Sequence, residues 1–264
     1  MRILNSSKLF ANKYYKSIKL GIIIILALLC FKATIIDDTD WNRIGSFRLL
    51  YESLSAFIPP DLSILKYMIK PALETVMIAI LGTSFSVIIS IPIAWLGAIN
   101  ITPNKLIVYP MARSIMILSR SIHEFVWGLI FVSAVGLGAL AGILAIGARS
   151  IGFMSKMIAE SIENINNGPI EVIKAVGGGP VQVIIYGIIP QLLPIILSTI
   201  IFQFDINIRR STIVGIVGAG GLGLTLQRQI ILYNYRGVTT VLLSILAIVL
   251  FSEVIAHYIR KERI

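Results

Sequence analysis

The sequence has little charge, a single cysteine and only two histidines. Of its 264 residues, 14% are charged and 56% are hydrophobic, and the mean hydropathy is +0.89. Soluble domains carry about 25% charged residues, so this composition excludes a soluble domain and indicates a polytopic membrane protein. The lone Cys30 lies in an apolar run, which leaves neither a disulfide framework nor a cysteine-based metal cluster. His123 and His257 are far apart in the sequence, so we expect no zinc site on them.

The charged residues are mostly basic: the sequence has 23 basic and 13 acidic residues, which gives a net charge of +10. In a soluble protein this excess would suggest nucleic acid as a partner. In a membrane protein the positive-inside rule accounts for much of it, so no nucleic acid is expected. Residues 1–19 contain basic residues and no acid, and the C-terminal end carries Arg260, Lys261 and Arg263. We therefore expect both termini to be cytoplasmic, and we expect no cleaved signal peptide.

Six apolar segments are long enough to cross a bilayer. They cover about residues 18–36, 71–99, 110–135, 138–161, 190–208 and 238–258. The fifth is about 28 Å long at 1.5 Å rise per residue, which matches the hydrocarbon core. Pro92 is expected to kink the second span. The sequence thus predicts an all-α membrane protein with about six transmembrane helices, in which residues 71–264 form the main membrane domain.

Residues 1–70 are expected to hold the first span and an external amphipathic segment. Within 41–57, apolar side chains recur at helical intervals. Two placements of this segment stay open: a helix lying flat in the outer leaflet, or a helix packed on the protein itself.

Four arginines between residues 209 and 236 disobey the charge rule, because the six-span topology places this segment outside. They are Arg209, Arg210, Arg228 and Arg236. Either the topology is wrong or these arginines face an aqueous vestibule, and we favour the vestibule.

A glycine-rich run at 218–223 matches G-x-G-x-x-G through Gly218, Gly220 and Gly223, with Gly221 between them. A dinucleotide site would need a preceding strand, a following helix and a later acid in one βαβ unit, and this context is missing. We predict instead a backbone break near the membrane, which is tolerated only where it lines a cavity or is buried in protein.

Charged residues within spans are costly and are therefore candidates for function. Arg149, Lys156 and Glu160 fall on one face of the fourth span, and Arg120 and Glu124 stand four residues apart on the third. Two interpretations stay open: interhelical pairs that fix packing, or a path for an anion lined by Arg149 and Arg209. The full candidate set for a path or gate is Arg120, Glu124, Arg149, Lys156, Asp205, Arg209, Gly218, Gly220 and Gly221.

The segment 165–189 lies between two spans and is predicted to be cytoplasmic. Its Gly177-Gly178-Gly179-Pro180 run cannot continue a helix, so the flanks 169–176 and 181–189 are predicted to form two short helices. Glu171 is expected near the start of the first, where it would meet the positive end of the helix dipole.

This segment resembles the cytoplasmic coupling loop of ABC importer permeases, whose pattern is E-A-A, three residues, G, nine residues, I-x-L-P. Glu171, Gly177 and Pro190 fall at the required spacing, whereas Val172-Ile173 replaces the two alanines, and Gly187 and Ile189 replace the Ile and the Leu. The resemblance implies that Glu171, Ala175, Gly177 and Pro190 contact a separate ATPase.

The stretches 120–163 and 204–223 resemble phosphonate ABC importer permeases, with Arg149 and Arg210 as departures from the family pattern. This resemblance implies a type I, MetI-like permease that moves phosphonate or phosphite across the inner membrane. The implied partners are an ATPase dimer that binds ATP and Mg, a periplasmic binding protein, a second copy of the chain and membrane lipid. No Walker A motif occurs in the sequence, so no cofactor is expected in this chain. A permease for methionine or another small solute is the alternative. A membrane-embedded enzyme is disfavoured, because the sequence shows no paired nucleophile and base.

Overall fold

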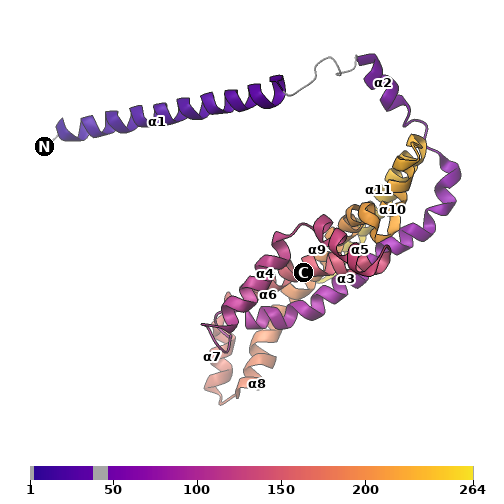
Figure 1. The fold of residues 1–264 in the computed structure, drawn as a ribbon. Coiled ribbons are helices and arrows are strands. Elements are labelled where there is room, and N and C mark those ends of the chain that lie inside the picture. The colour runs from indigo at the N-terminus through magenta and orange to yellow at the C-terminus, as the bar shows by residue number, and fades with distance from the viewer. Residues whose placement is uncertain (1–2, 38–46, 264) are drawn as a thin grey trace. The chain divides into compact units, whose positions relative to one another are not determined.

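Every regular element in the part of the chain that the structure describes, residues 3–37 and 47–263, is a helix (Figure 1). The structure, a computed structural model, divides into two units, Met1–Ser55 and Ala56–Ile264. In the first unit, helix α1 covers Ile3–Phe31 and continues into the π-helical turn η1, Lys32–Asp37. Ile18–Asp37 is long and apolar enough to cross a membrane, as predicted. Helix α2 covers Phe47–Ser55, and the rest of the predicted amphipathic segment up to residue 46 lies outside the described residues.

The core of the second unit is built on helices α3, α6, α9 and α11. They cover Ile69–Leu96, Ala139–Glu163, Ile189–Val214 and Tyr235–Arg263. Small residues let α3 and α6 lie close together, because a Cβ added to Gly82 would stand 3.1 Å from Cγ2 of Ile146. Ile78, Ala145 and Val214 are buried around this crossing, where α9 joins the pair. Pro92 lies inside α3.

The predicted third span, 110–135, is not one straight helix. It consists of α4, Val108–Ser121, and α5, Glu124–Val135, which meet at an angle of 92°. Ile122 is extended, and Nδ1 of His123 accepts a hydrogen bond of 3.3 Å from the backbone N–H of Phe125, which caps the start of α5. The described residues therefore contain five helices able to span, or six if this bent pair counts as one, in agreement with the predicted number.

The predicted fifth span is much longer than 190–208. A continuous helical run of 40 residues, Pro180–Ala219, includes α8 (Pro180–Gln182), the π-helical turn η4 (Val183–Ile188), α9 and the π-helical turn η5 (Gly215–Ala219). Residues 209–219 thus continue the helix of the fifth span and do not form a separate segment. Asp205, Arg209 and Arg210 obscured this continuity, because charge inside an apolar run is the usual sign of a span's end.

Three short helices of the second unit lie outside its spans, and the first is the 3-10 helix η3, Leu62–Tyr67. Helix α7, Asn167–Ala175, and the start of the long run at α8 form a hairpin, while α10, Gly221–Ile231, follows the glycine break (Figure 1). In Figure 1 the α7–α8 hairpin forms one end of this unit. The predicted sixth span lies within α11.

Candidate functional site

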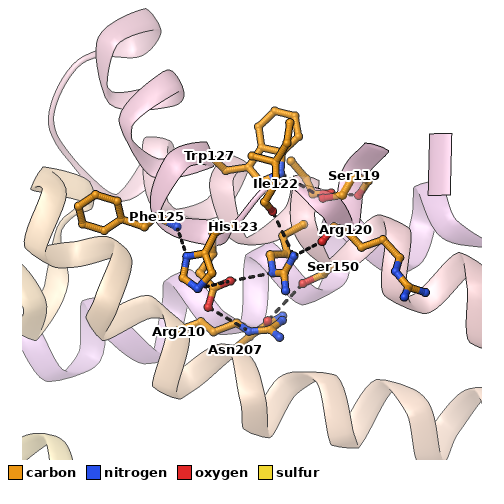
Figure 2. A network of polar contacts seen from close by, with 12 residues as sticks. Ser119, Arg120, Ile122, His123, Phe125, Trp127, Ser150, Asn207 and Arg210 are labelled. Carbon is orange, nitrogen blue, oxygen red and sulfur yellow. Dashed lines mark hydrogen bonds and ion pairs between the residues drawn. The ribbon is translucent and has the colours of Figure 1, made fainter. Parts of the chain in front are cut away.

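The buried carboxylate of Glu124 pairs with arginines from two other helices. Figure 2 shows the surrounding polar network, with His123, Arg210, Ser150 and Asn207 close together. The side chain of Glu124 is only 7% exposed, and this residue begins α5. Oε2 of Glu124 lies 2.7 Å from Nε of Arg149 on α6, and Oε1 lies 3.6 Å from Nε of Arg210 on α9. Nε2 of His123 lies 3.7 Å from Oε2. The two departures from the family pattern, Arg149 and Arg210, therefore converge on one carboxylate.

Arg149 also closes the broken end of α4. Its Nη1 donates to the backbone carbonyls of Arg120 and Ile122, the second at 3.1 Å. Carbonyls at a helix end inside a membrane need such a partner, because lipid supplies none. The expected four-residue pair between Arg120 and Glu124 is wrong in the described structure: the chain turns between them, and Glu124 faces Arg149 and Arg210 instead.

A buried amide network lies next to this cluster. Nδ2 of Asn207 donates to Oγ1 of Thr83 at 2.9 Å, and Oδ1 of Asn207 accepts from Oγ of Ser150 at 3.2 Å. Nε2 of Gln203 donates to Ser150 and Asn207, at 2.9 and 3.1 Å. The network ties α3, α6 and α9 together, and none of its four residues was among the candidates predicted from the sequence. Two amides four residues apart in an apolar helix were the available signal.

A cavity of about 330 Å³ lies beside the cluster, and four cations line it: Arg120, Arg149, Lys156 and Arg210, with Phe153 and Met157. Lys156 pairs with Glu160 at 3.3 Å on α6, as their spacing predicted. Arg209, by contrast, is not among the lining residues. Its Nη2 lies 2.6 Å from Oδ2 of Asp205, whose Oδ1 accepts a hydrogen bond from Ser252, so this pair joins α9 to α11.

The glycine run does form the predicted backbone break. Gly218, Gly220 and Gly221 have φ of 98°, 88° and 66°, values that other residues rarely adopt. The breaks are buried, and their polar groups have partners: the carbonyl of Gly218 accepts from the N–H of Gly138 at 3.0 Å. The N–H of Leu222 donates to Oγ1 of Thr75 at 2.8 Å. This break therefore lies in protein, as the sequence required.

The predicted first short helix and turn are present as α7 and Gly177, whereas the predicted second short helix, 181–189, is the start of the long run Pro180–Ala219. Gly177 forms the turn with φ of 85°, and the N–H of Gly178 donates to the carbonyl of Ile173 at 2.9 Å. Glu171 is exposed and lies one turn inside α7, which begins at Asn167, so its expected place at the positive helix end is wrong. Ala175 ends α7, and Pro190 lies in the first turn of α9.

The hairpin is anchored to the membrane core by apolar side chains of α7. Ile170 and Ile173 pack against the buried cluster that includes Ile162, Val183 and Leu192. The exposed fraction of Val176 at the tip is 81%, so an apolar side chain stands in solvent there. The base of the hairpin is therefore fixed to the helices of the core, while its tip is exposed.

Known proteins with similar sequences belong to transport systems. A family model described as "Binding-protein-dependent transport system inner membrane component" matches residues 90–263. The chain is 35% identical over 239 residues to "Putative phosphite transport system permease protein HtxC" and, equally, to "Phosphite transport system permease protein PtxC", both of Stutzerimonas stutzeri. These matches cover 90% of this chain and 84% and 86% of the two relatives.

A solved structure of the MetNI methionine ABC transporter in an inward-facing conformation has a similar fold. Its TM-score is 0.65 at 22% identity, and the match covers 77% of this chain and 99% of that chain. At this identity the likeness shows the fold, which is the MetI-like fold that the sequence predicted.

Proposed function

This chain belongs to the binding-protein-dependent transport system inner membrane components, and on that premise we propose that it is the permease of an ATP-driven importer for phosphonate, phosphite or a related phosphorus oxyanion. The observation that carries the ligand class is the 35% identity to two phosphite permeases over nearly the whole chain. The family consists of multi-pass transport subunits, so this chain is a transport subunit and not an enzyme.

The methionine alternative has weaker support. The MetNI structure is 22% identical to this chain, which bears on the fold, whereas the phosphite permeases are 35% identical. A phosphorus oxyanion also suits the chemistry of the second unit, because the cavity between its helices is lined by cations.

The α7–α8 hairpin carries the coupling in this proposal. Glu171, Ala175 and Gly177 contact an ATPase dimer in the cytoplasm, and Pro190 lies where the hairpin joins α9. The ATPase binds ATP and Mg, and this chain holds no cofactor. The exposed tip at Val176 and the anchored base at Ile173 support this assignment.

The assembly follows from the number of coupling hairpins. The described residues contain one, the α7–α8 hairpin, and an ATPase dimer offers two docking grooves, so a second copy of the chain completes the membrane part. A periplasmic binding protein delivers the ligand outside, and ATP closure inside shifts the permease between two states. The proposed orientation in the inner membrane has both termini and the hairpin in the cytoplasm.

The candidate path residues take separate roles in this proposal. Arg120, Glu124, Arg149 and Lys156 lie on the translocation path. Asp205 and Arg209 hold α9 against α11, because Asp205 pairs with Arg209 and accepts a hydrogen bond from Ser252. The positive φ values of Gly218, Gly220 and Gly221 support a gate at the break, where the backbone can change direction.

Uptake by cells that lack this gene tests the function. We expect loss of ATP-dependent uptake of labelled phosphite or methylphosphonate, restored by the gene in trans, with methionine uptake unchanged. If only methionine uptake is lost, the transported solute is methionine and not a phosphorus oxyanion. Unchanged uptake of all three solutes would contradict the proposal.

A further inference from the structure

The basic cavity has more positive charge than the protein itself neutralises. Four cations line it, while the carboxylates that pair with them are Glu124 and Glu160. The four cations and two carboxylates thus carry a net charge of +2, and among the described residues Arg120 has no carboxylate partner. Arg120 is exposed, whereas Arg210 is only 21% exposed and its side chain donates no hydrogen bond to any part of the chain that the structure describes. Guanidinium donors in such surroundings call for an acceptor.

The cavity lies deep within the membrane part of the second unit. Arg149 stands ten residues into α6, about 15 Å from one end of a helix about 37 Å long. Uncompensated charge at this depth is costly and marks paths for polar solutes. The neighbouring break between α4 and α5 agrees, because irregular backbone at membrane depth lines a cavity or is buried in protein.

The chemistry of the lining fits a small oxyanion. Three of the four cations are arginines, whose planar donors bind phosphate-like oxygens in pairs. Phe153 and Met157 complete the lining and limit its hydration, which strengthens the electrostatic attraction. At about 30 Å³ per water, 330 Å³ holds about ten waters, enough for a small anion with part of its hydration shell.

We infer that this cavity is a binding site for the phosphorus oxyanion in transit, and that Glu124 is its resident counter-anion, which the oxyanion displaces from Arg210. This inference rests on the proposed function. The two ion pairs of Glu124 are unequal, at 2.7 Å to Arg149 and 3.6 Å to Arg210. Arg149 is also held by the carbonyls at the end of α4, so it stays in place. Arg210 has the looser contact and turns to the arriving ligand, after which Glu124 competes for it and promotes release.

Binding to the full permease–ATPase complex in nanodiscs, without binding protein, tests the site. The probe is methylphosphonate, measured by calorimetry, and methionine serves as the neutral comparison. We expect Arg120→Gln and Lys156→Gln each to raise the Kd for methylphosphonate about tenfold. This is the change expected when one hydrogen bond to a charged group is lost. Lys70→Gln, at an exposed position outside the cavity, is the matched control and leaves the Kd unchanged. Unchanged Kd values in both cavity variants would overturn the inference, as would binding of methionine with equal affinity.

Glu124→Gln tests the competition. Removal of the counter-anion should tighten methylphosphonate binding severalfold while it lowers the maximal rate of uptake, a split that a purely structural role would not produce. Weaker binding by a folded Glu124→Gln complex would overturn the role of Glu124. If this variant does not fold, Arg120→Gln and Lys156→Gln still decide whether the cavity binds the anion.

A lipid headgroup offers similar chemistry to a basic pocket between helices. Nanodiscs of zwitterionic lipid alone and nanodiscs that also contain phosphatidylglycerol separate the two sources. We expect methylphosphonate to bind in both. Retention of phosphatidylglycerol that blocks methylphosphonate would overturn the inference in favour of a lipid site.

Uptake distinguishes failure of this inference from failure of the proposed function. If cells with the wild-type gene import no phosphorus oxyanion through it, the function fails. If the wild-type chain imports methylphosphonate and the cavity variants import it equally well, only the inference fails.

Discussion

The carboxylate of Glu124, at the start of α5, and the guanidinium of Arg149 on α6 meet at 2.7 Å beside the break between α4 and α5. The same guanidinium donates to the backbone carbonyl of Ile122, so it holds both sides of the break. This one side chain explains how a bend of 92° is stable within a membrane.

Loss of either partner should destabilise the second unit. We expect Arg149→Met to lower the stability of the purified permease by about 3 kcal/mol, the lower end of the range for breaking buried pairs, because Arg149 keeps some contact with water. Thermal unfolding in detergent measures this. Addition of Glu124→Gln to Arg149→Met should cost less than the sum of the two single changes. Additive effects would contradict a direct pair.

The turn of the hairpin allows a test that isolates the partner. Gly177 has φ of 85°, and a Cβ there would meet no atom of this chain within 4 Å. Asn and Asp are the residues that best tolerate this backbone after glycine. We therefore expect Gly177→Asn to retain uptake, whereas Gly177→Asp places a charge on the docking surface and uncouples ATP hydrolysis from uptake. Normal uptake by Gly177→Asp would contradict the coupling role.

Close packing around the glycine break should not tolerate a methyl group. A Cβ at Gly215 would lie 2.5 Å from the carbonyl oxygen of Gly220 and 2.8 Å from Cα of Gly223, both backbone atoms that cannot rotate away. We expect Gly215→Ala to reduce the amount of folded permease severalfold, as judged by size-exclusion chromatography. Gly21→Ala is the control, because a Cβ there meets nothing within 4 Å. Equal yields of the two variants would contradict the packing argument.

The contribution of Asp61 to the stability of the fold should change with pH only at acidic pH. Hydrogen bonds from the side chain and the backbone N–H of Ser63 lower the pKa of Asp61 from its ordinary value of 3.8. Because the folded pKa is lower than the unfolded one, the contribution is complete above pH 3.8 and is lost as pH falls through the folded pKa. The difference in Tm between wild type and Asp61→Ala should therefore stay constant across neutral pH and shrink below pH 3.8. A difference that changes near neutrality would point to another group.

The features predicted from the sequence are those that local chemistry decides. A glycine–proline run cannot continue a helix, so the turn at Gly177 followed from residue types alone. The break at Gly218 and Gly220 followed in the same way, and its burial followed from the membrane setting.

The features missed depend on partners far along the chain. The bend at Ile122 has no proline or glycine beside it, and its carbonyls are held by Arg149, 27 residues later. Arg210 joins Glu124 across 86 positions, and Asn207 joins Thr83 across 124. Periodicity reports which face of a helix a residue occupies and not what stands opposite. For that reason the sequence favoured Arg209, whereas Arg210 lines the cavity.

The helical run from Pro180 to Ala219, which ends in the glycine break, sets a length scale for the second unit. Forty residues at 1.5 Å each make a rod about 60 Å long, roughly twice the thickness of the hydrocarbon core. One end is the hairpin and the other is the glycine break. By lever geometry, a tilt of about 5° about one end moves the other by about 5 Å, close to one helical turn. A small tilt of this run at the hairpin therefore becomes a sideways displacement of several ångströms at the glycine break.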